Sequence, residues 1–168
     1  TGVQTCALPI YETYLDKQRT SFESYLSRMD FSYTTPNGVY RYVANADREG
    51  YDREVSVEYG DSVSFDFAAY LFSSSIGALY YTNVKEWIPA KDLEVLNPEY
   101  WDFSTRRIKL GSVSLVKGLE YGLVNSRQND SLLLFMTSDL VYGTENMGVV
   151  SPDQPVVWAV KIKKVVKP

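Results

Sequence analysis

The chain has 168 residues, of which 45% are hydrophobic and 23% charged, and its net charge is −4. This size and composition predict a globular domain with a buried core, and the scattered lysines and arginines argue against nucleic acid as a partner. The sequence contains no histidine and a single cysteine, Cys6. Histidine general bases and the usual zinc sites are therefore excluded, and we expect no metal and no other cofactor.

Cys6 lies in the first ten residues, TGVQTCALPI. A common sequencing-adapter primer translates to these ten residues, so we interpret residues 1–10 as a read artefact and set them aside before reasoning about the fold. On this interpretation Cys6 has no biological role. The protein's own N-terminus, with any export signal, is then missing from the sequence.

The segment that follows, residues 11–30, predicts an N-terminal amphipathic helix. Leu15, Phe22 and Leu26 fall on one stripe at helical spacing, and charged residues such as Glu23 fall on the opposite side. This stripe is expected to pack against the domain or against a second copy of the chain.

From Phe31 onward the apolar pattern has the period of two that is typical of strands. We expect strands at residues 39–44, 55–59, 62–71, 106–110, 131–136 and 156–166. The continuous apolar run at 131–136 is typical of a strand that is buried on both faces. One helix followed by several strands, a short helix and further strands indicates the α+β class with an antiparallel sheet.

That short second helix is predicted at residues 114–124, although Gly118 and Gly122 lower its helix propensity. Residues 84–105 are irregular apart from one helical turn, and residues 137–155 form a long loop. We find no internal repeat.

Three stretches of the sequence match the pattern of one known family. Residues 60–65 read GDSVSF, residues 110–123 read LGSVSLVKGLEYGL, and residues 138–162 contain SDLVYG, GVVSP and VVWAVKI. Together these motifs resemble FKBP-type peptidyl-prolyl cis-trans isomerases: the family's GD-x-V strand, the segment leading into its helix and its C-terminal part. Residues 35–40, TPNGVY, resemble the start of the domain in exported bacterial members. The resemblance spans about residues 31–168, in the family's order.

The resemblance implies an FKBP-like domain at residues 31–168, with a curled antiparallel β-sheet wrapped on one short helix and an insertion at about 84–105. It also implies rotation about X–Pro bonds, a reaction that needs neither a nucleophile nor a metal. The planar amide resists rotation with a barrier of ~18–20 kcal/mol. A pocket with apolar, aromatic walls would bind the twisted amide more tightly than the planar one, which is the differential binding that catalysis requires.

Carried over position by position, the family's site falls on ten residues of this chain. The implied catalytic set is Phe67, Val116, Leu119, Tyr142 and Trp158. The implied substrate-binding set is Tyr80, Tyr81, Leu115, Val149 and Val150. The hydroxyl of Tyr142 and the backbone N–H of Val116 are the implied hydrogen-bond donors to the substrate. Apart from Tyr142 and Tyr81, the remaining eight side chains also fit an ordinary hydrophobic core.

Three positions depart from the family pattern. Leu119 stands where the family has a tryptophan at the pocket floor, and Tyr81 stands where it has an acidic residue. Arg106 stands where it has an aromatic wall residue, and residues 84–105 are longer than the family's usual connection. These departures leave a second hypothesis, a non-catalytic peptide-binding or chaperone module on the same scaffold.

Two other function classes are weaker. Trp87, Tyr100 and Trp101 could stack on sugars in a glycan-binding β-sandwich, but that fold needs neither the glycine-framed helix nor the C-terminal motif. A two-carboxylate hydrolase is weaker still, because the candidate acids read more readily as solvated charges on strands and turns. These acids are Asp52, Glu54, Glu58, Asp61 and Asp66.

The expected partners are proline-containing polypeptides that are unfolded or still folding. A helix ahead of an FKBP-like domain resembles the arrangement in exported lipoproteins of gut-type bacteria. We therefore expect a periplasmic or outer-membrane location, with membrane attachment through a lipid anchor upstream of the given sequence.

Overall fold

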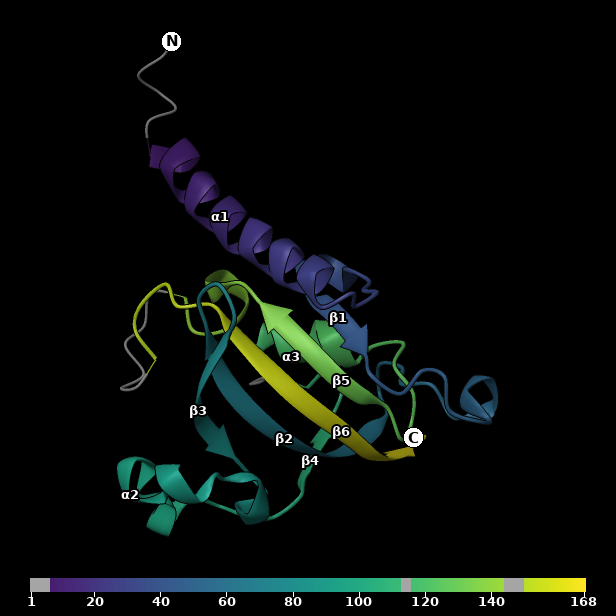
Figure 1. The fold of residues 1–168 in the computed structure, drawn as a ribbon. Helices are drawn as coiled ribbons and strands as arrows, with labels where there is room; N and C mark the ends of the chain where they lie inside the picture. Colours follow the sequence, from purple (N-terminus) through teal and green to yellow (C-terminus); the bar gives the residue numbers. More distant parts are fainter. Residues whose placement is uncertain (1–6, 113–115, 144–149) are drawn as a thin grey trace.

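A curled antiparallel sheet lies between a long helix on one face and a short helix on the other (Figure 1). This arrangement is seen in a computed structural model, which describes residues 7–112, 116–143 and 150–168. The strands are β1 (Tyr40–Val43), β2 (Ser62–Phe72), β3 (Ile76–Thr82), β4 (Arg106–Lys109), β5 (Ser131–Met136) and β6 (Val156–Val166). The α-helices in these ranges are α1 (Ala7–Arg28), α2 (Leu93–Leu96) and α3 (Lys117–Leu123).

The strand order is β1-β5-β6-β2-β3, with β4 also pairing with β2, and every pair is antiparallel. The predicted α+β class is therefore confirmed. The longest pairing joins β2 to β6, and it is interrupted by one register shift between Ser64 and Phe65. None of the helices in the described ranges is long and apolar enough to cross a membrane.

Three expectations about the elements need correction. Residues 55–59 are not a strand: Ser56 forms only an isolated bridge with Arg127, because the segment pairs with the loop that follows α3. The backbone N–H of Val57, for example, donates to the carbonyl of Ser126 at 2.7 Å. The strand β3 was not expected from the pattern, and α1 begins at Ala7, inside the ten residues interpreted as an artefact.

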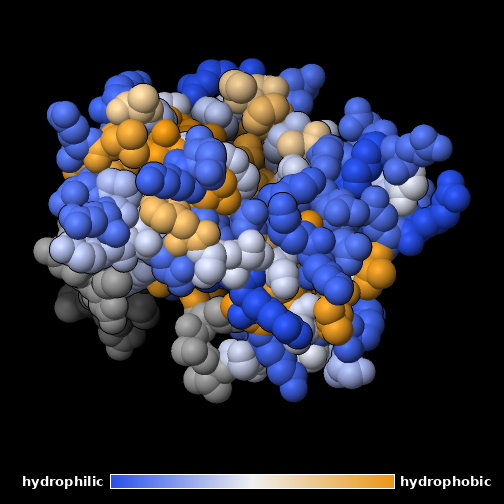
Figure 2. All heavy atoms as spheres, turned by 90° about the horizontal axis from the view of Figure 1, so that it is seen from below, coloured by the Kyte–Doolittle hydropathy of each residue, from blue (hydrophilic) through white to orange (hydrophobic). Residues whose placement is uncertain are grey.

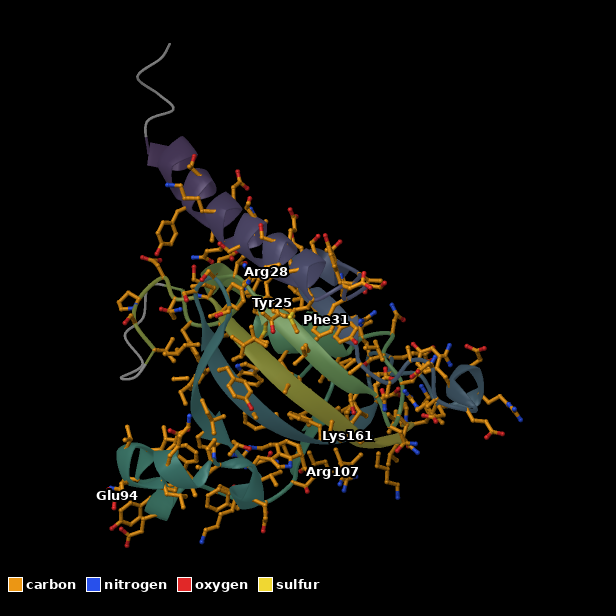
Figure 3. All side chains as sticks on the ribbon, in the orientation of Figure 1. Tyr25, Arg28, Phe31, Glu94, Arg107 and Lys161 are labelled. Atoms are coloured by element: carbon orange, nitrogen blue, oxygen red, sulfur yellow. The ribbon has the colours of Figure 1, made fainter. Side chains whose placement is uncertain are left out.

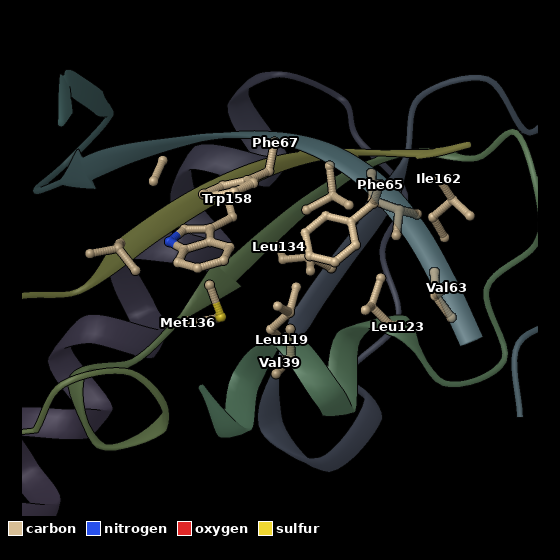
Figure 4. Close-up of a cluster of buried hydrophobic side chains, with 14 of the residues drawn as sticks. Val39, Val63, Phe65, Phe67, Leu119, Leu123, Leu134, Met136, Trp158 and Ile162 are labelled. Atoms are coloured by element: carbon tan, nitrogen blue, oxygen red, sulfur yellow. The ribbon is translucent and has the colours of Figure 1, made fainter. Parts of the chain in front are cut away.

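The main hydrophobic core fills the space between the concave face of the sheet and α3 (Figure 4). Alternate residues of β5, Leu132, Leu134 and Met136, point into this core, whereas Phe135 belongs to a second cluster beneath α1. The expectation that residues 131–136 are buried on both faces is confirmed only in part: Phe135 is buried beneath α1, whereas Leu133 on the same face is half-buried.

The two glycines of α3 bring the helix close to β5. A Cβ on Gly118 would lie 2.5 Å from the sulfur of Met136, and a Cβ on Gly122 would lie 2.7 Å from Cδ1 of Leu134. Real Cβ atoms essentially never show separations under 3.0 Å. The glycines lower intrinsic helix propensity, as the sequence indicates, and they also remove the side chains that would push the helix away from the sheet.

The amphipathic helix α1 packs its apolar stripe on the convex face of the sheet. The ring of Phe22 meets Phe72 edge-on at a centroid distance of 5.0 Å and Phe135 at 5.6 Å. Phe22 and Leu26 are fully buried. Figure 3 shows that Tyr25 of the same helix lies on the side that faces the sheet. The structure therefore supports the first of the two expected roles of the stripe, packing against the domain.

Residues 84–105 run along the sheet edge next to β3 and reach its convex face. Ile88 is buried with Ala68 and Leu79, and Trp101 packs against this small cluster. Several other apolar side chains of the segment face solvent, most clearly Val95, which is 83% exposed. In the view from below, hydrophobic residues gather on the left, the side on which α2 lies (Figure 2).

The close contact between α3 and β5 gives a stability prediction. Gly122→Ala should lower the free energy of unfolding by about 1–2 kcal/mol, because a cost of up to ~3 kcal/mol for overpacking a filled core outweighs the gain of ~1 kcal/mol in helix propensity. Thermal unfolding of the variant is compared with that of Lys117→Ala, an exposed substitution in the same helix that should change little. A Gly122→Ala variant as stable as the wild type would contradict the packing argument.

The buried carboxylate of Asp61 gives a pH prediction. Burial alone would raise its pKa, but hydrogen bonds from Lys167 Nζ (2.7 Å) and the backbone N–H of Glu58 (2.9 Å) prevail and lower the pKa below the usual 3.8. The stabilisation is therefore present above that value and is lost as the pH falls through the lower, folded-state pKa.

Melting temperatures recorded from pH 7 down to about pH 2.5 test this linkage. Asp61→Asn should melt below the wild type at pH 7, and the two curves should converge at the acid end. The exposed substitution Asp47→Asn serves as the control and should follow the wild type throughout. Parallel curves for Asp61→Asn and the wild type would contradict the assignment.

Candidate functional site

The structure brings most of the predicted site residues into one cluster on the concave face of the sheet. Five of them are buried members of the main core: Phe67, Tyr80, Leu119, Val150 and Trp158. Three more are half-buried and pack against it: Tyr81, Val116 and Tyr142. The remaining two, Leu115 and Val149, lie outside the described residues.

Two aromatic rings form the centre of this cluster. Phe67 on β2 and Trp158 on β6 stack with centroids 4.8 Å apart and an interplanar angle of 18°. Their strands are neighbours, and Ala68, which follows Phe67, pairs with Ala159, which follows Trp158. Phe67 and Trp158 therefore lie on the same face of the sheet. Figure 4 shows both rings on the side of the sheet that faces α3 and Leu119. The pair gives the site a flat apolar wall.

Tyr80 connects Trp158 to Tyr142. The indole N–H of Trp158 donates to the Tyr80 hydroxyl at 2.9 Å, and that hydroxyl lies 3.4 Å from the hydroxyl of Tyr142. Burial raises the pKa of Tyr80 well above its usual value, and it also raises the pKa of Tyr142. Both hydroxyls therefore remain protonated at neutral pH and can act as hydrogen-bond donors.

The loop that carries Tyr142 is attached to α1. The buried side chain of Gln18 accepts a hydrogen bond from the backbone N–H of Ser138 at 2.9 Å, and its amide nitrogen donates to the Ser138 hydroxyl at 3.2 Å. The same nitrogen donates to the carbonyl of Asp153 at 3.0 Å. The N-terminal helix thus holds both ends of the loop, a role that its amphipathic pattern did not reveal.

Arg106 occupies the rim of the cluster. Its guanidinium carbon lies 6.0 Å from the ring centre of Phe67 and 5.9 Å from that of Tyr81, within the range of a cation–π contact. Its two terminal nitrogens donate to the Tyr81 hydroxyl and to Asp102 Oδ2, each at 2.8 Å. Trp101 lies 4.7 Å from the Tyr81 ring. The end of the 84–105 segment is thereby fixed beside the site.

Asp102 and Trp101 were not assigned to this site from the sequence. Arg106 could have indicated Asp102, because a cation that replaces an aromatic wall residue needs a nearby anion, and Asp102 lies four residues earlier.

The other side of the site is formed by α3, which begins directly after Val116. The carbonyl of Val116 accepts the backbone N–H groups of Leu119 and Glu120.

The alternative sites do not form. Four of the five candidate carboxylates take part in ion pairs at three different lysines and arginines: Glu54 with Arg48, Glu58 and Asp61 with Lys167, and Asp66 with Lys163. The aromatic residues of the glycan hypothesis do not form one stacking platform either. Trp101 packs on Tyr81, whereas Tyr100 is 88% exposed.

A separate groove of about 610 Å³ lies on the convex face, between the end of α1 and the 84–105 segment. Phe31 and Tyr42, whose rings stack 4.1 Å apart, form one wall, and Trp87 contributes to the lining. The charged residues that line it are Lys161 and Lys163. Figure 3 shows Phe31 and Lys161 on this face. The groove is thus on the opposite side of the sheet from the aromatic cluster.

The concave face thus combines a curled antiparallel sheet, a short helix, stacked aromatic rings and a tyrosine hydroxyl. The comparison with protein families identifies the family to which these features belong. The family model of FKBP-type peptidyl-prolyl cis-trans isomerases matches residues 54–163. The chain belongs to this family.

Solved structures agree with this assignment at the level of the fold. A peptidyl-prolyl cis-trans isomerase from Pseudomonas syringae pv. tomato superposes with a TM-score of 0.62 at 15% identity, covering 93% of this chain and 96% of its own. The structure of the three FKBP domains of wheat FKBP73 gives a TM-score of 0.60 at 15% identity, covering 82% and 50% respectively. The search of curated proteins finds no match.

Proposed function

We propose that this protein catalyses cis-trans isomerisation of X–Pro bonds in exported polypeptides, with the concave aromatic cluster as its active site. The observation that carries this proposal is the convergence of Phe67, Leu119, Trp158 and Tyr142 in one cluster, in a chain of the FKBP-type family. These residues come from two strands, a helix and a loop that are far apart in sequence.

The proposed mechanism relies on differential binding. A planar X–Pro amide is resonance-stabilised and strongly dipolar, whereas the amide at the top of the rotation barrier has lost that resonance. The stacked rings of Phe67 and Trp158 and the side chain of Leu119 offer a weakly polar surface, which favours the less dipolar, twisted form. Each 1.36 kcal/mol of this preference accelerates rotation tenfold.

Hydrogen-bond donors at the edge of the pocket would add to this effect. Tyr142 is half-buried and protonated at neutral pH, and the backbone N–H of Val116 precedes α3. In the proposed complex these two groups hold the substrate's carbonyl oxygens on either side of the rotating bond. Donors that are already in place need no reorganisation during the reaction.

We further propose that the substrates are proline-containing segments of unfolded or folding proteins outside the cytoplasm, and that a lipid anchor upstream of α1 attaches the protein to a membrane. What supports this is the TPNG turn at residues 35–38 and the helix that precedes the domain, both of which resemble exported bacterial members. Sequencing of the upstream codons tests the anchor, which requires an apolar leader that ends in a cysteine.

A second candidate function is favoured by the rim. Tyr81 and Arg106 hydrogen-bond to each other instead of presenting an acidic group and an apolar ring. A protein with this rim could bind proline-containing peptides without accelerating their rotation, and would act as a holding chaperone.

A protease-coupled assay on a short X–Pro peptide separates the two functions. Wild-type protein should make the slow isomerisation phase of peptide cleavage faster than it is in buffer alone. Tyr142→Phe should lower kcat/KM about tenfold, because one donor hydrogen bond of ~1.4 kcal/mol is lost. Tyr70→Phe, a hydroxyl removed from the convex face, is the matched control. A wild-type rate equal to buffer, combined with measurable peptide binding, would leave only the chaperone function.

The charge of Arg106 predicts a preference among substrates. A peptide with glutamate before the proline should be processed about three to five times faster than one with lysine, the range expected for an exposed ion pair of up to ~1 kcal/mol. Arg106→Gln should abolish this difference, and added salt should weaken it.

Arg107→Gln is the matched control for this experiment. Arg107 is the next residue on β4, and adjacent residues of a strand point to opposite faces. Its substitution should leave the glutamate-to-lysine ratio unchanged. An equal ratio in the wild type and Arg106→Gln would show that Arg106 only anchors the 84–105 segment.

A further inference from the structure

Three polar groups stand in line along the wall of the aromatic cluster: the indole N–H of Trp158, the hydroxyl of Tyr80 and the hydroxyl of Tyr142. Trp158 is 7% exposed and Tyr80 is 9% exposed, while Tyr142 is half-buried at the outer end. An indole N–H can only donate. The first bond of the line therefore has a fixed direction, from Trp158 to the oxygen of Tyr80.

The direction of the second bond follows from burial. The Tyr80 hydroxyl accepts from Trp158, so its own proton needs an acceptor, and an unsatisfied buried donor costs about 1–3 kcal/mol. The Tyr142 oxygen, at 3.4 Å, is the acceptor that the described structure offers. If Tyr142 donated instead, the buried proton of Tyr80 would be left without this partner.

We propose that Tyr80 is a positioning residue, whose hydroxyl accepts from Trp158 and donates to Tyr142 so that the Tyr142 proton is directed outward to the substrate carbonyl. This inference rests on the proposed function and adds the residue that orients its main donor. It also assigns the Trp158 indole nitrogen a part in catalysis that a phenylalanine ring at this position would lack.

The bond between Tyr80 and Tyr142 is the weak one of the line, and in the proposal it strengthens when substrate binds. A separation of 3.4 Å is long for two hydroxyl groups, which usually approach to 2.7–2.8 Å. Hydrogen bonds in a chain polarise one another, so an acceptor at the outer end reinforces the bonds behind it. The Tyr142 loop is held from the other side by Gln18 and Ser138, so its hydroxyl has limited freedom to turn away.

A double-mutant cycle on full-length protein tests the proposal, with kcat/KM on one X–Pro peptide as the measurement. Tyr80→Phe alone should lower kcat/KM about fivefold, the effect of a misdirected donor. In the Tyr142→Phe background the same substitution should have no further effect, because the donor that Tyr80 orients is already gone. Trp158→Phe keeps an aromatic ring, removes the indole N–H, and should repeat this pattern with a smaller loss.

Tyr70→Phe again provides the control, and melting temperatures confirm that each variant is folded. A merely structural role for Tyr80 predicts the same loss in both backgrounds, so equal losses would overturn the proposal. An active wild type with an unaffected Tyr80→Phe variant would also overturn it and leave the proposed function intact. A wild type without activity would instead remove the proposed function, and this inference with it.

Discussion

The depth of the concave cluster depends on how closely α3 approaches β5. Gly118 and Gly122 face Met136 and Leu134 at distances that leave no room for a Cβ. Protein interiors are packed as densely as organic crystals, so a larger residue at either glycine would require the facing side chain or the helix to shift. Leu119 stands between the two glycines and is buried in the same core cluster as the aromatic wall. The same spacing that stabilises the core therefore sets the floor of the proposed site.

The helix α1 packs on the convex face of the sheet and also bonds to the loop that carries Tyr142 on the concave face. On the convex face, Phe22 and Leu26 cover the sheet and contribute ordinary hydrophobic burial. One turn earlier, Gln18 bonds to Ser138 and Asp153, at the two ends of the loop that carries Tyr142. A helix whose pattern indicates packing alone thus also determines where the proposed donor lies on the concave side. The position of the Tyr142 loop therefore depends on an element that contributes no residue to the aromatic cluster.

Most of the fold could be predicted from the sequence because its strands alternate, and residues 132–136 of β5 are all apolar. The failures have local causes. Val57 lies in an alternating stretch, yet its backbone pairs with the loop after α3 and forms no ladder. The strand β3 was missed because Leu79 and Tyr80 are both buried, one on each face of the sheet, so its pattern lacks the alternation of a half-exposed strand.

For the predicted site residues, the structure shows only which of them lie together. The motif matches located the residues that form the aromatic wall, because motifs fix positions along the chain. They did not indicate which polar groups bond to one another. The link from Trp158 through Tyr80 to Tyr142, and the attachment of Arg106 to Asp102, depend on side-chain distances across strands and loops. Such contacts follow from tertiary packing, and no spacing in the sequence encodes them.

An apolar pocket gains its selectivity for a twisted amide only if its own polar groups do not interact with the planar one. Three polar groups in the wall of this cluster could do so, yet two of them, on Trp158 and Tyr80, use their protons within the protein in the proposed arrangement. Only the hydroxyl of Tyr142 keeps a proton for the substrate. The wall can therefore be polar in composition and still present a surface of rings with a single directed donor. At the rim, the guanidinium of Arg106 also has partners within the protein, Tyr81 and Asp102, and lies against the ring of Phe67, so in the proposed arrangement its charge acts on substrate side chains beside the proline and not on the rotating amide. Internal pairing of this kind allows a tyrosine-rich site to remain weakly polar where the amide rotates.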